Sequence, residues 1–145
     1  MIGEVMEYTK NVPKYTFELK KNMVLLKDID INTIFDLNLA AYLLNKNTKD
    51  DLAILMNNDS IEVPIIHEII KKKMDVKPFV TLKAKYISDL HDKYIDDLKS
   101  EEMYDLYTNI EHPLIRVLAK MELNGIRCDK NILSEMASKF SVQIE

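Results

Sequence analysis

Glycine is scarce in this sequence: the 145 residues contain only two, against an average usage of about 7%. Folds built from tightly turned β-strands depend on glycine at positive φ, so the scarcity favours a helical protein. It also excludes a P-loop and a dinucleotide-binding fingerprint, because neither glycine has the partner glycines that these motifs require.

Cysteine is almost absent too. Cys128 stands alone, so no intramolecular disulfide can form and a single thiol cannot build a zinc site. The first residues lack the basic start and apolar stretch of a signal peptide, and no apolar run approaches the roughly 20 residues needed to cross a bilayer. The composition therefore predicts a cytoplasmic globular protein of about one domain.

Arginine is rare as well: Arg116 and Arg127 are the only two among the 20 basic residues, and the net charge is −4. A net negative charge argues against a nucleic-acid-binding surface that extends over the whole chain. A local basic run, Lys71, Lys72 and Lys73, is a candidate nucleic-acid contact. The alternative is that these three lysines interact with a helix C-terminus and water.

Helical periodicity is what the sequence does contain. Apolar residues recur at helical spacing in most segments, while the β-branched run Ile31–Asp36 has the composition of a short strand. We therefore predict a mainly α fold with one or two short strands near Ile31–Asp36 (α+β). The predicted helices cover residues 15–26, 37–44, 51–56, 63–73, 79–98, 101–110, 113–124 and 130–145.

Polar residues at three predicted helix starts indicate how those helices are capped. Thr48 and Asp51 form a plausible capping pair for the helix that ends at Met56. Ser100 is expected to cap the 101–110 helix, and Asp129 the last one.

The segment from Glu111 to Asp129 is framed by one of the four prolines and one of the two glycines. Pro113 fits a helix start, and Gly125 fits the left-handed residue that ends a helix. Between them, Leu114, Val117, Leu118 and Met121 follow i, i+3, i+4, i+7 spacing. We expect this stripe to be buried against the 79–98 and 101–110 helices.

Two blocks of the sequence resemble the family A DNA polymerases, the bacterial DNA polymerase I type. The first, Ile34–Asn45, resembles the segment of the 3′–5′ exonuclease domain in which an aspartate follows a strand and precedes a helix. The second resembles the run that joins this domain to the polymerase thumb. It is carried by Glu111, Pro113, Leu114, Leu118, Met121, Glu122, Gly125, Ile126, Asp129 and Leu133.

The resemblance implies a fragment of a DNA-directed DNA polymerase, a nucleotidyltransferase of DNA replication and repair. Residues 1–110 would form a partial, degenerate exonuclease-like domain of the ribonuclease H-like fold, and residues 111–145 a linker helix and the start of the thumb. The polymerase would bind DNA and Mg²⁺ elsewhere in its chain, and its other parts would be the partners of this region. The chain itself is expected to hold no metal or cofactor.

The exonuclease chemistry of that family requires an Asp-x-Glu, a later aspartate and a Tyr-x-x-x-Asp that together hold two metal ions. Asp36 is the one match, to the later aspartate, and the other two motifs are missing. One carboxylate cannot hold two hard cations, so Asp36 is interpreted as a vestigial ligand that caps a helix. His91 and Asp96 match a histidine version of the third motif, whereas His67 and His112 are isolated. We therefore expect no catalytic residue.

Other interpretations remain open at this point. A stand-alone helical protein-interaction module without enzymatic activity is the main alternative, and a metal-dependent nuclease is the weakest because carboxylates are missing. The apolar stripe of the last helix, which includes Leu133, Met136 and Phe140, runs on to the end of the sequence and favours a piece of a longer chain. Exposed apolar surface could also lead to self-association.

Overall fold

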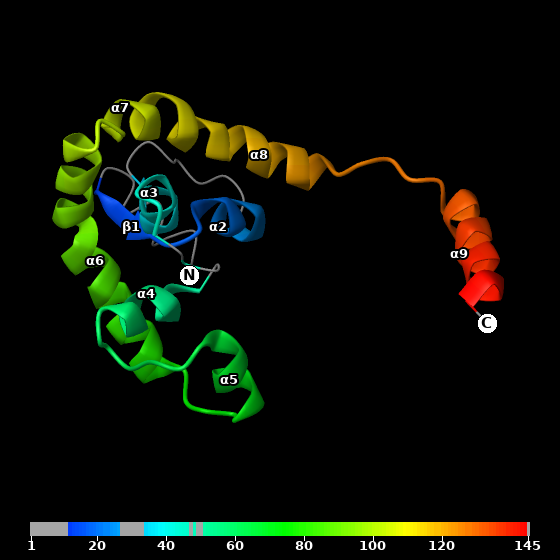
Figure 1. Cartoon of the computed structure of the whole chain (residues 1–145), viewed down its shortest axis with the longest axis horizontal. Coiled ribbons are helices and arrows are strands. Elements are labelled where there is room, and N and C mark those ends of the chain that lie inside the picture. Colours follow the sequence, from blue (N-terminus) through cyan, green and yellow to red (C-terminus); the bar gives the residue numbers. More distant parts are fainter. Residues whose placement is uncertain (1–11, 27–33, 47, 49–50, 145) are drawn as a thin grey trace.

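The computed structural model describes residues 12–26, 34–46, 48 and 51–144 (Figure 1). The described part is mainly helical with one small sheet, as the sequence predicts. None of its helices is long and apolar enough to cross a membrane. The elements are β1 Lys14–Thr16, α2 Leu19–Leu26, β2 Ile34–Asp36, α3 Leu37–Leu43, α4 Leu52–Asn58, α5 Ile66–Lys71, α6 Lys77–Ser100, α7 Tyr104–Leu106, the π-helix η1 Tyr107–Glu111, α8 His112–Asn124 and α9 Lys130–Ile144.

The sheet consists of β1 and β2, which pair in parallel with Tyr15 opposite Phe35. The second half of the predicted strand is confirmed as β2, and its first half, residues 31–33, lies outside the described residues. Tyr15 is a correction: we predicted it in a helix, but it lies in β1, and α2 begins only at Leu19. Pairing with a strand 20 residues away outweighs the local helical spacing. A local sequence pattern does not contain such a distant contact.

The main core lies between α3, α4 and α6, and the predicted long helix is confirmed as α6. Leu37, Met56 and Leu98 are fully buried there. The predicted helix after Ile34–Asp36 is confirmed as α3. The predicted 63–73 helix is shorter, since α5 spans only Ile66–Lys71.

Two of the predicted caps are wrong. Asp51 is itself the N-cap of α4 and accepts a hydrogen bond from the Ala53 N–H at 3.0 Å. Thr48 instead donates its hydroxyl to Asn38 Oδ1 in α3, at 2.6 Å. Ser100 is the last residue of α6 and donates to the Asp97 carbonyl at 2.9 Å, so it ends a helix rather than starting one.

The buried face of α8 also differs from the prediction. Its buried residues are Ile115 and Ala119, whereas Leu118 in the predicted stripe is 43% exposed. The cover comes mainly from α2, where Leu19 packs with Ile34 and Ile115 in a second, smaller core. Helical spacing identified the apolar stripe of α8 correctly. It could not show that α2 covers the neighbouring face, which carries Ile115 and Ala119. The expected burial of Leu114, Val117, Leu118 and Met121 is therefore wrong.

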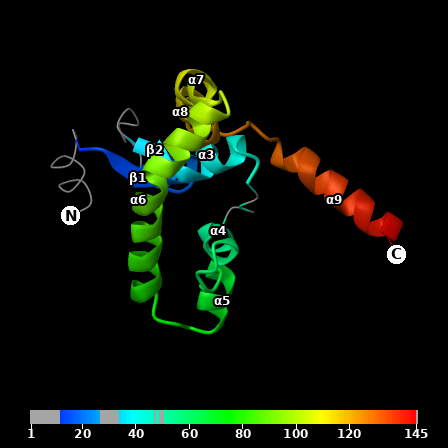
Figure 2. The ribbon, with the colours of Figure 1, turned by 60° about the vertical axis from the view of Figure 1, so that its left-hand side comes forward.

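The frame of α8 is as predicted. Pro113 lies in the first turn, and Gly125 ends the helix at φ 67° and ψ −173°, a region open essentially to glycine alone. Asp129 caps α9 by accepting from the Asn131 N–H at 2.8 Å. No residue of α9 is buried, and the helix lies apart from the rest of the molecule (Figures 1 and 2). The predicted domain boundary after residue 110 falls within η1, which runs directly into α8, and it stays a prediction.

Candidate functional site

Asp36 stands at the junction of several elements. It is the last residue of β2 and the N-cap of α3, where Oδ1 accepts from the Asn38 N–H at 3.0 Å. The same carboxylate accepts from the start of α2: the Glu18 N–H bonds Oδ1 at 3.1 Å and the Leu19 N–H bonds Oδ2 at 2.8 Å. One side chain therefore caps two helices.

The surroundings of Asp36 are closed. The residue is 4% exposed, and its own N–H donates to the Tyr107 hydroxyl at 2.9 Å. Burial raises the pKa of the Asp36 carboxyl, while the backbone N–H groups of the two helix starts oppose this rise. Burial likewise raises the pKa of Tyr107, so this phenol stays protonated at neutral pH.

The other candidate metal ligands do not gather around Asp36. His91 Nδ1 lies 2.8 Å from Asp92 Oδ1, and the Asp96 side chain is 80% exposed, 4.0 Å from Lys99. Within the described ranges, no group of three or more His, Cys, Asp or Glu side chains is placed to hold a metal ion. Sequence reasoning placed the cap role of Asp36 correctly but could not foresee its bonds to α2.

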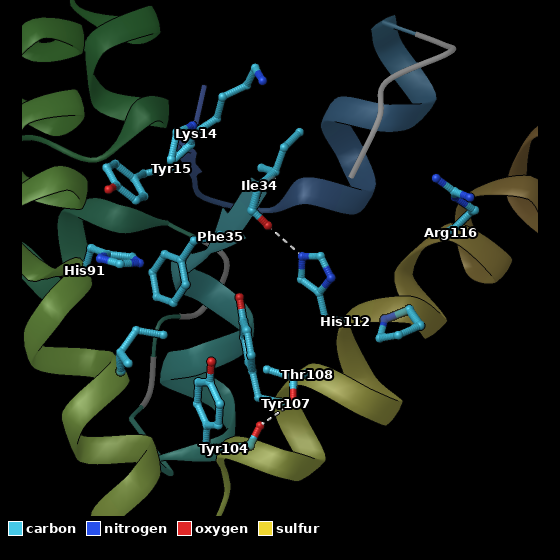
Figure 3. A pocket seen from close by; sticks show the side chains of 13 residues that line it. Lys14, Tyr15, Ile34, Phe35, His91, Tyr104, Tyr107, Thr108, His112 and Arg116 are labelled. Atoms are coloured by element: carbon cyan, nitrogen blue, oxygen red, sulfur yellow. Dashed lines mark hydrogen bonds between the residues drawn. The ribbon is translucent and has the colours of Figure 1, made fainter. Parts of the chain in front are cut away.

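An aromatic pocket of about 490 Å³ lies beside the junction (Figure 3). Strand β1 contributes Tyr15, β2 contributes Phe35, and α6 contributes His91. The His91 ring lies 4.5 Å from Tyr15 and 4.9 Å from Phe35, nearly perpendicular to the latter. The pocket is also lined by Tyr104, Tyr107 and Thr108, which lie in the lower part of Figure 3.

The opposite side of the pocket is formed by the start of α8. His112 Nε2 donates to the Ile34 carbonyl at 2.6 Å, which ties α8 to β2 and orients the imidazole ring. Arg116 follows one turn later, and Lys14 of β1 also lines the pocket. His112 had no ligand spacing in the sequence; its role depends on a contact with a residue 78 positions away, so no local signal could have revealed it.

Lys71, Lys72 and Lys73 lie at the C-terminal end of α5 and are all exposed. Lys72 Nζ is 3.6 Å from Glu68 in the preceding turn. None of the three lines the aromatic pocket. A nucleic-acid contact at this run stays a prediction.

The sequence is similar to those of several bacterial DNA polymerases. The sequence is 31% identical to DNA polymerase I of Lactococcus lactis subsp. lactis over 142 residues, which covers 88% of this chain and 16% of the relative. It is 30% identical to DNA polymerase I of Geobacillus stearothermophilus over 145 residues, 91% of this chain and 17% of the relative. For DNA polymerase I of Bacillus subtilis the identity is 25% over 145 residues, 91% of this chain and 16% of the relative.

The relatives are DNA polymerases. More particularly, the chain is related over most of its length to a segment of bacterial DNA polymerase I, which confirms the resemblance to the family A enzymes. The chain spans about a sixth of the length of these relatives. No family model matches the sequence, and no solved structure matches it significantly.

Proposed function

We propose that this chain forms a structural, catalytically inactive exonuclease-like region of a family A DNA polymerase, with a partial ribonuclease H-like fold. The relationship to DNA polymerase I over most of the chain and the parallel strand pair followed by α3 support the proposal. In such a polymerase, Mg²⁺-dependent DNA synthesis and most contacts with DNA would belong to the rest of the enzyme. This region would support its neighbours mechanically.

The bonding of Asp36 is the observation that carries the proposal. Its two oxygens accept three backbone N–H groups, so three of the about four lone-pair sites of the carboxylate are engaged within the protein. A hard divalent cation requires six or more oxygen ligands, which are supplied by carboxylates, carbonyls and waters. A buried cap at 4% exposure does not meet that requirement.

A nuclease assay tests the inactivity directly. The purified chain is incubated with an end-labelled single strand and Mg²⁺ or Mn²⁺, in parallel with the Asp36→Ala variant. We expect neither protein to shorten the strand, and neither to extend a primer on a template. Shortening by the parent chain that disappears in a folded Asp36→Ala variant would refute the proposal, because it would make Asp36 a working metal ligand.

A second candidate function is self-association as an interaction module. Two observations favour it: the exposed stripe of α8 and the exposed stripe of α9. The apolar residues of the two helices are placed at equal sequence distances on either side of Arg127, so antiparallel pairing of α8 with α9 brings them opposite one another. The pairs are Met121 with Leu133, Leu118 with Met136, and Leu114 with Phe140.

A second copy of the chain is the partner that this pattern fits. In the structure α9 lies away from the α8 of its own chain, which leaves both stripes available to a twofold-related copy (Figures 1 and 2). Light scattering should then show a dimer that Leu118→Lys or Met136→Glu weakens and that the double variant restores through an ion pair. A monomer at all concentrations would contradict this candidate function and would leave closure of α9 onto its own α8 as the alternative.

A further inference from the structure

The charges of α6 are distributed unevenly along the helix. Its first half contains Lys77, Lys83 and Lys85 and no acidic residue, whereas its second half contains four aspartates. The N-terminus of a helix carries a partial positive charge, so a cation in the first turn is unfavourable and an anion favourable. Lys77 lies in that turn, which has no acidic side chain. The helix dipole therefore does not account for the lysines at this end.

Most of these lysines have no partner within the chain. Residues 66–85 include six lysines and two acidic residues, a net charge of +4 in a chain whose net charge is −4. Lys72 pairs with Glu68, and Lys83 pairs with Asp51. Among the described residues, no ion-pair partner is found for the ammonium groups of Lys71, Lys73, Lys77 and Lys85. This part of the surface can therefore accept negative charge from another molecule.

The same surface is also apolar. Four large aliphatic side chains are each more than half exposed there: Ile66, Ile70, Val76 and Val80. The first two lie one turn apart on α5, and the last two lie one turn apart at the start of α6. Figures 1 and 2 place α5 and the first turns of α6 at the end of the molecule opposite α7. We call the exposed residues of 66–85 the basic end.

We propose that the basic end binds a partner protein through an acidic amphipathic helix of that partner. The acidic side chains of such a helix face the ammonium groups of Lys71, Lys73 and Lys77, and its apolar face covers Ile70 and Val80. The surface fits a nucleic acid less well. Phosphates would pair with the lysines but leave the aliphatic side chains uncovered, and neither arginine of the chain lies in this segment.

A synthetic peptide is the probe for this surface. It has about 20 residues, all glutamate or leucine, with the leucines at helical spacing so that they form one face. The fluorescein-labelled peptide is titrated with the chain at low salt, and binding is followed by fluorescence anisotropy. The comparison probes are a scrambled peptide of the same composition, a thymidine strand of the same length, and phosphatidylserine vesicles. We expect the amphipathic peptide to bind most tightly, and added salt to weaken its binding by screening the charges.

Matched variants locate the bound peptide. Lys77→Glu should weaken binding about fivefold, whereas Lys93→Glu, at an exposed position in the second half of α6, should leave it nearly unchanged. Ile70→Ser should weaken binding about tenfold through the loss of apolar burial, and its control is Ile126→Ser, at a 92% exposed position outside the basic end. The far-UV spectrum of each variant verifies its fold.

Stability provides a second readout for Lys77→Glu. The substitution places an anion in the first turn of α6, so it should raise the urea midpoint while it weakens peptide binding. A purely structural role for Lys77 would not produce a gain in stability together with a loss of binding. The proposal is overturned if Lys77→Glu and Lys93→Glu bind the peptide equally, or if the scrambled peptide binds as tightly as the amphipathic one.

The other possible occupants are separate outcomes of the same titrations. Tighter binding of the thymidine strand, lost in Lys77→Glu, would assign the basic end to a nucleic acid, and tighter binding of the vesicles would assign it to a lipid surface. Association of the chain with itself that Lys77→Glu abolishes would make a second copy the occupant. Each of these results refutes the proposal. Because none involves strand cleavage, failure here leaves the proposed structural role intact.

Discussion

Replacement of Ile115 by alanine tests which face of α8 holds the molecule together. Ile115 is 7% exposed and packs with Leu19 and Ile34, which are 1% and 7% exposed. Deletion of a large buried aliphatic side chain costs about 2–5 kcal/mol. The second core has only three buried residues, and its partly buried neighbours Met23 and Leu39 can shift toward the gap. Alanine also has the higher helix propensity, so we expect a loss of about 2–3 kcal/mol.

Leu118→Ala is the matched comparison, because it lies on the same helix and is 43% exposed. We expect it to lower the free energy of unfolding by less than about 1 kcal/mol. Urea titrations followed by circular dichroism give both values, provided that the slopes of the two transitions agree. A larger loss for Leu118→Ala than for Ile115→Ala would refute the assignment of the buried face and would return α8 to the orientation that the sequence alone suggested.

Three further predictions concern the polar and backbone features of the fold. Asp36→Asn should lower the free energy of unfolding by about 1–3 kcal/mol, since an amide NH₂ cannot accept all three N–H groups; an unchanged urea midpoint would contradict the double cap. Gly125→Val should cost about 1–3 kcal/mol in the same assay because of its positive φ, and a neutral result would show that the helix end rearranges freely. Burial tends to raise the pKa of Asp51, but hydrogen bonds from the Ile66 and Ala53 N–H groups and the charge of Lys83 lower it overall. Asp51 should therefore contribute its full stabilisation above about pH 4, and this contribution should be lost as the pH falls through the lowered pKa. Urea midpoints measured from about pH 6 to pH 3 should fall less steeply for Asp51→Asn than for the parent chain. An equally steep fall in the two proteins would exclude this role for Asp51.

Features with a local cause were predictable from the sequence. Pro113 and Gly125 frame α8 because each imposes its own backbone geometry, and the period of the 79–98 segment indicated α6. Asp36 could be interpreted as a cap because an aspartate between a strand and a helix commonly takes that role.

Features that depend on distant partners were not predictable. The spacing around Tyr15 predicts a helix, but the segment forms a strand because it pairs with β2. Whether α8 buries the Ile115 face or the Leu118 face depends on the position of α2. The aromatic pocket combines residues from β1, β2, α6, η1 and α8, which are far apart in the sequence. Only the fold brings those residues together.

The isolation of α9 affects how the chain should respond to heating. It has 15 residues and no buried side chain, and a helix of this length without tertiary contacts is marginal in water. Its loss of helicity should therefore be gradual and begin well below the cooperative melting of the core, and its amides should exchange with solvent by local fraying. A sloping pre-transition baseline in the far-UV melt would belong to α9, whereas sharp, simultaneous melting would show that something has docked against it.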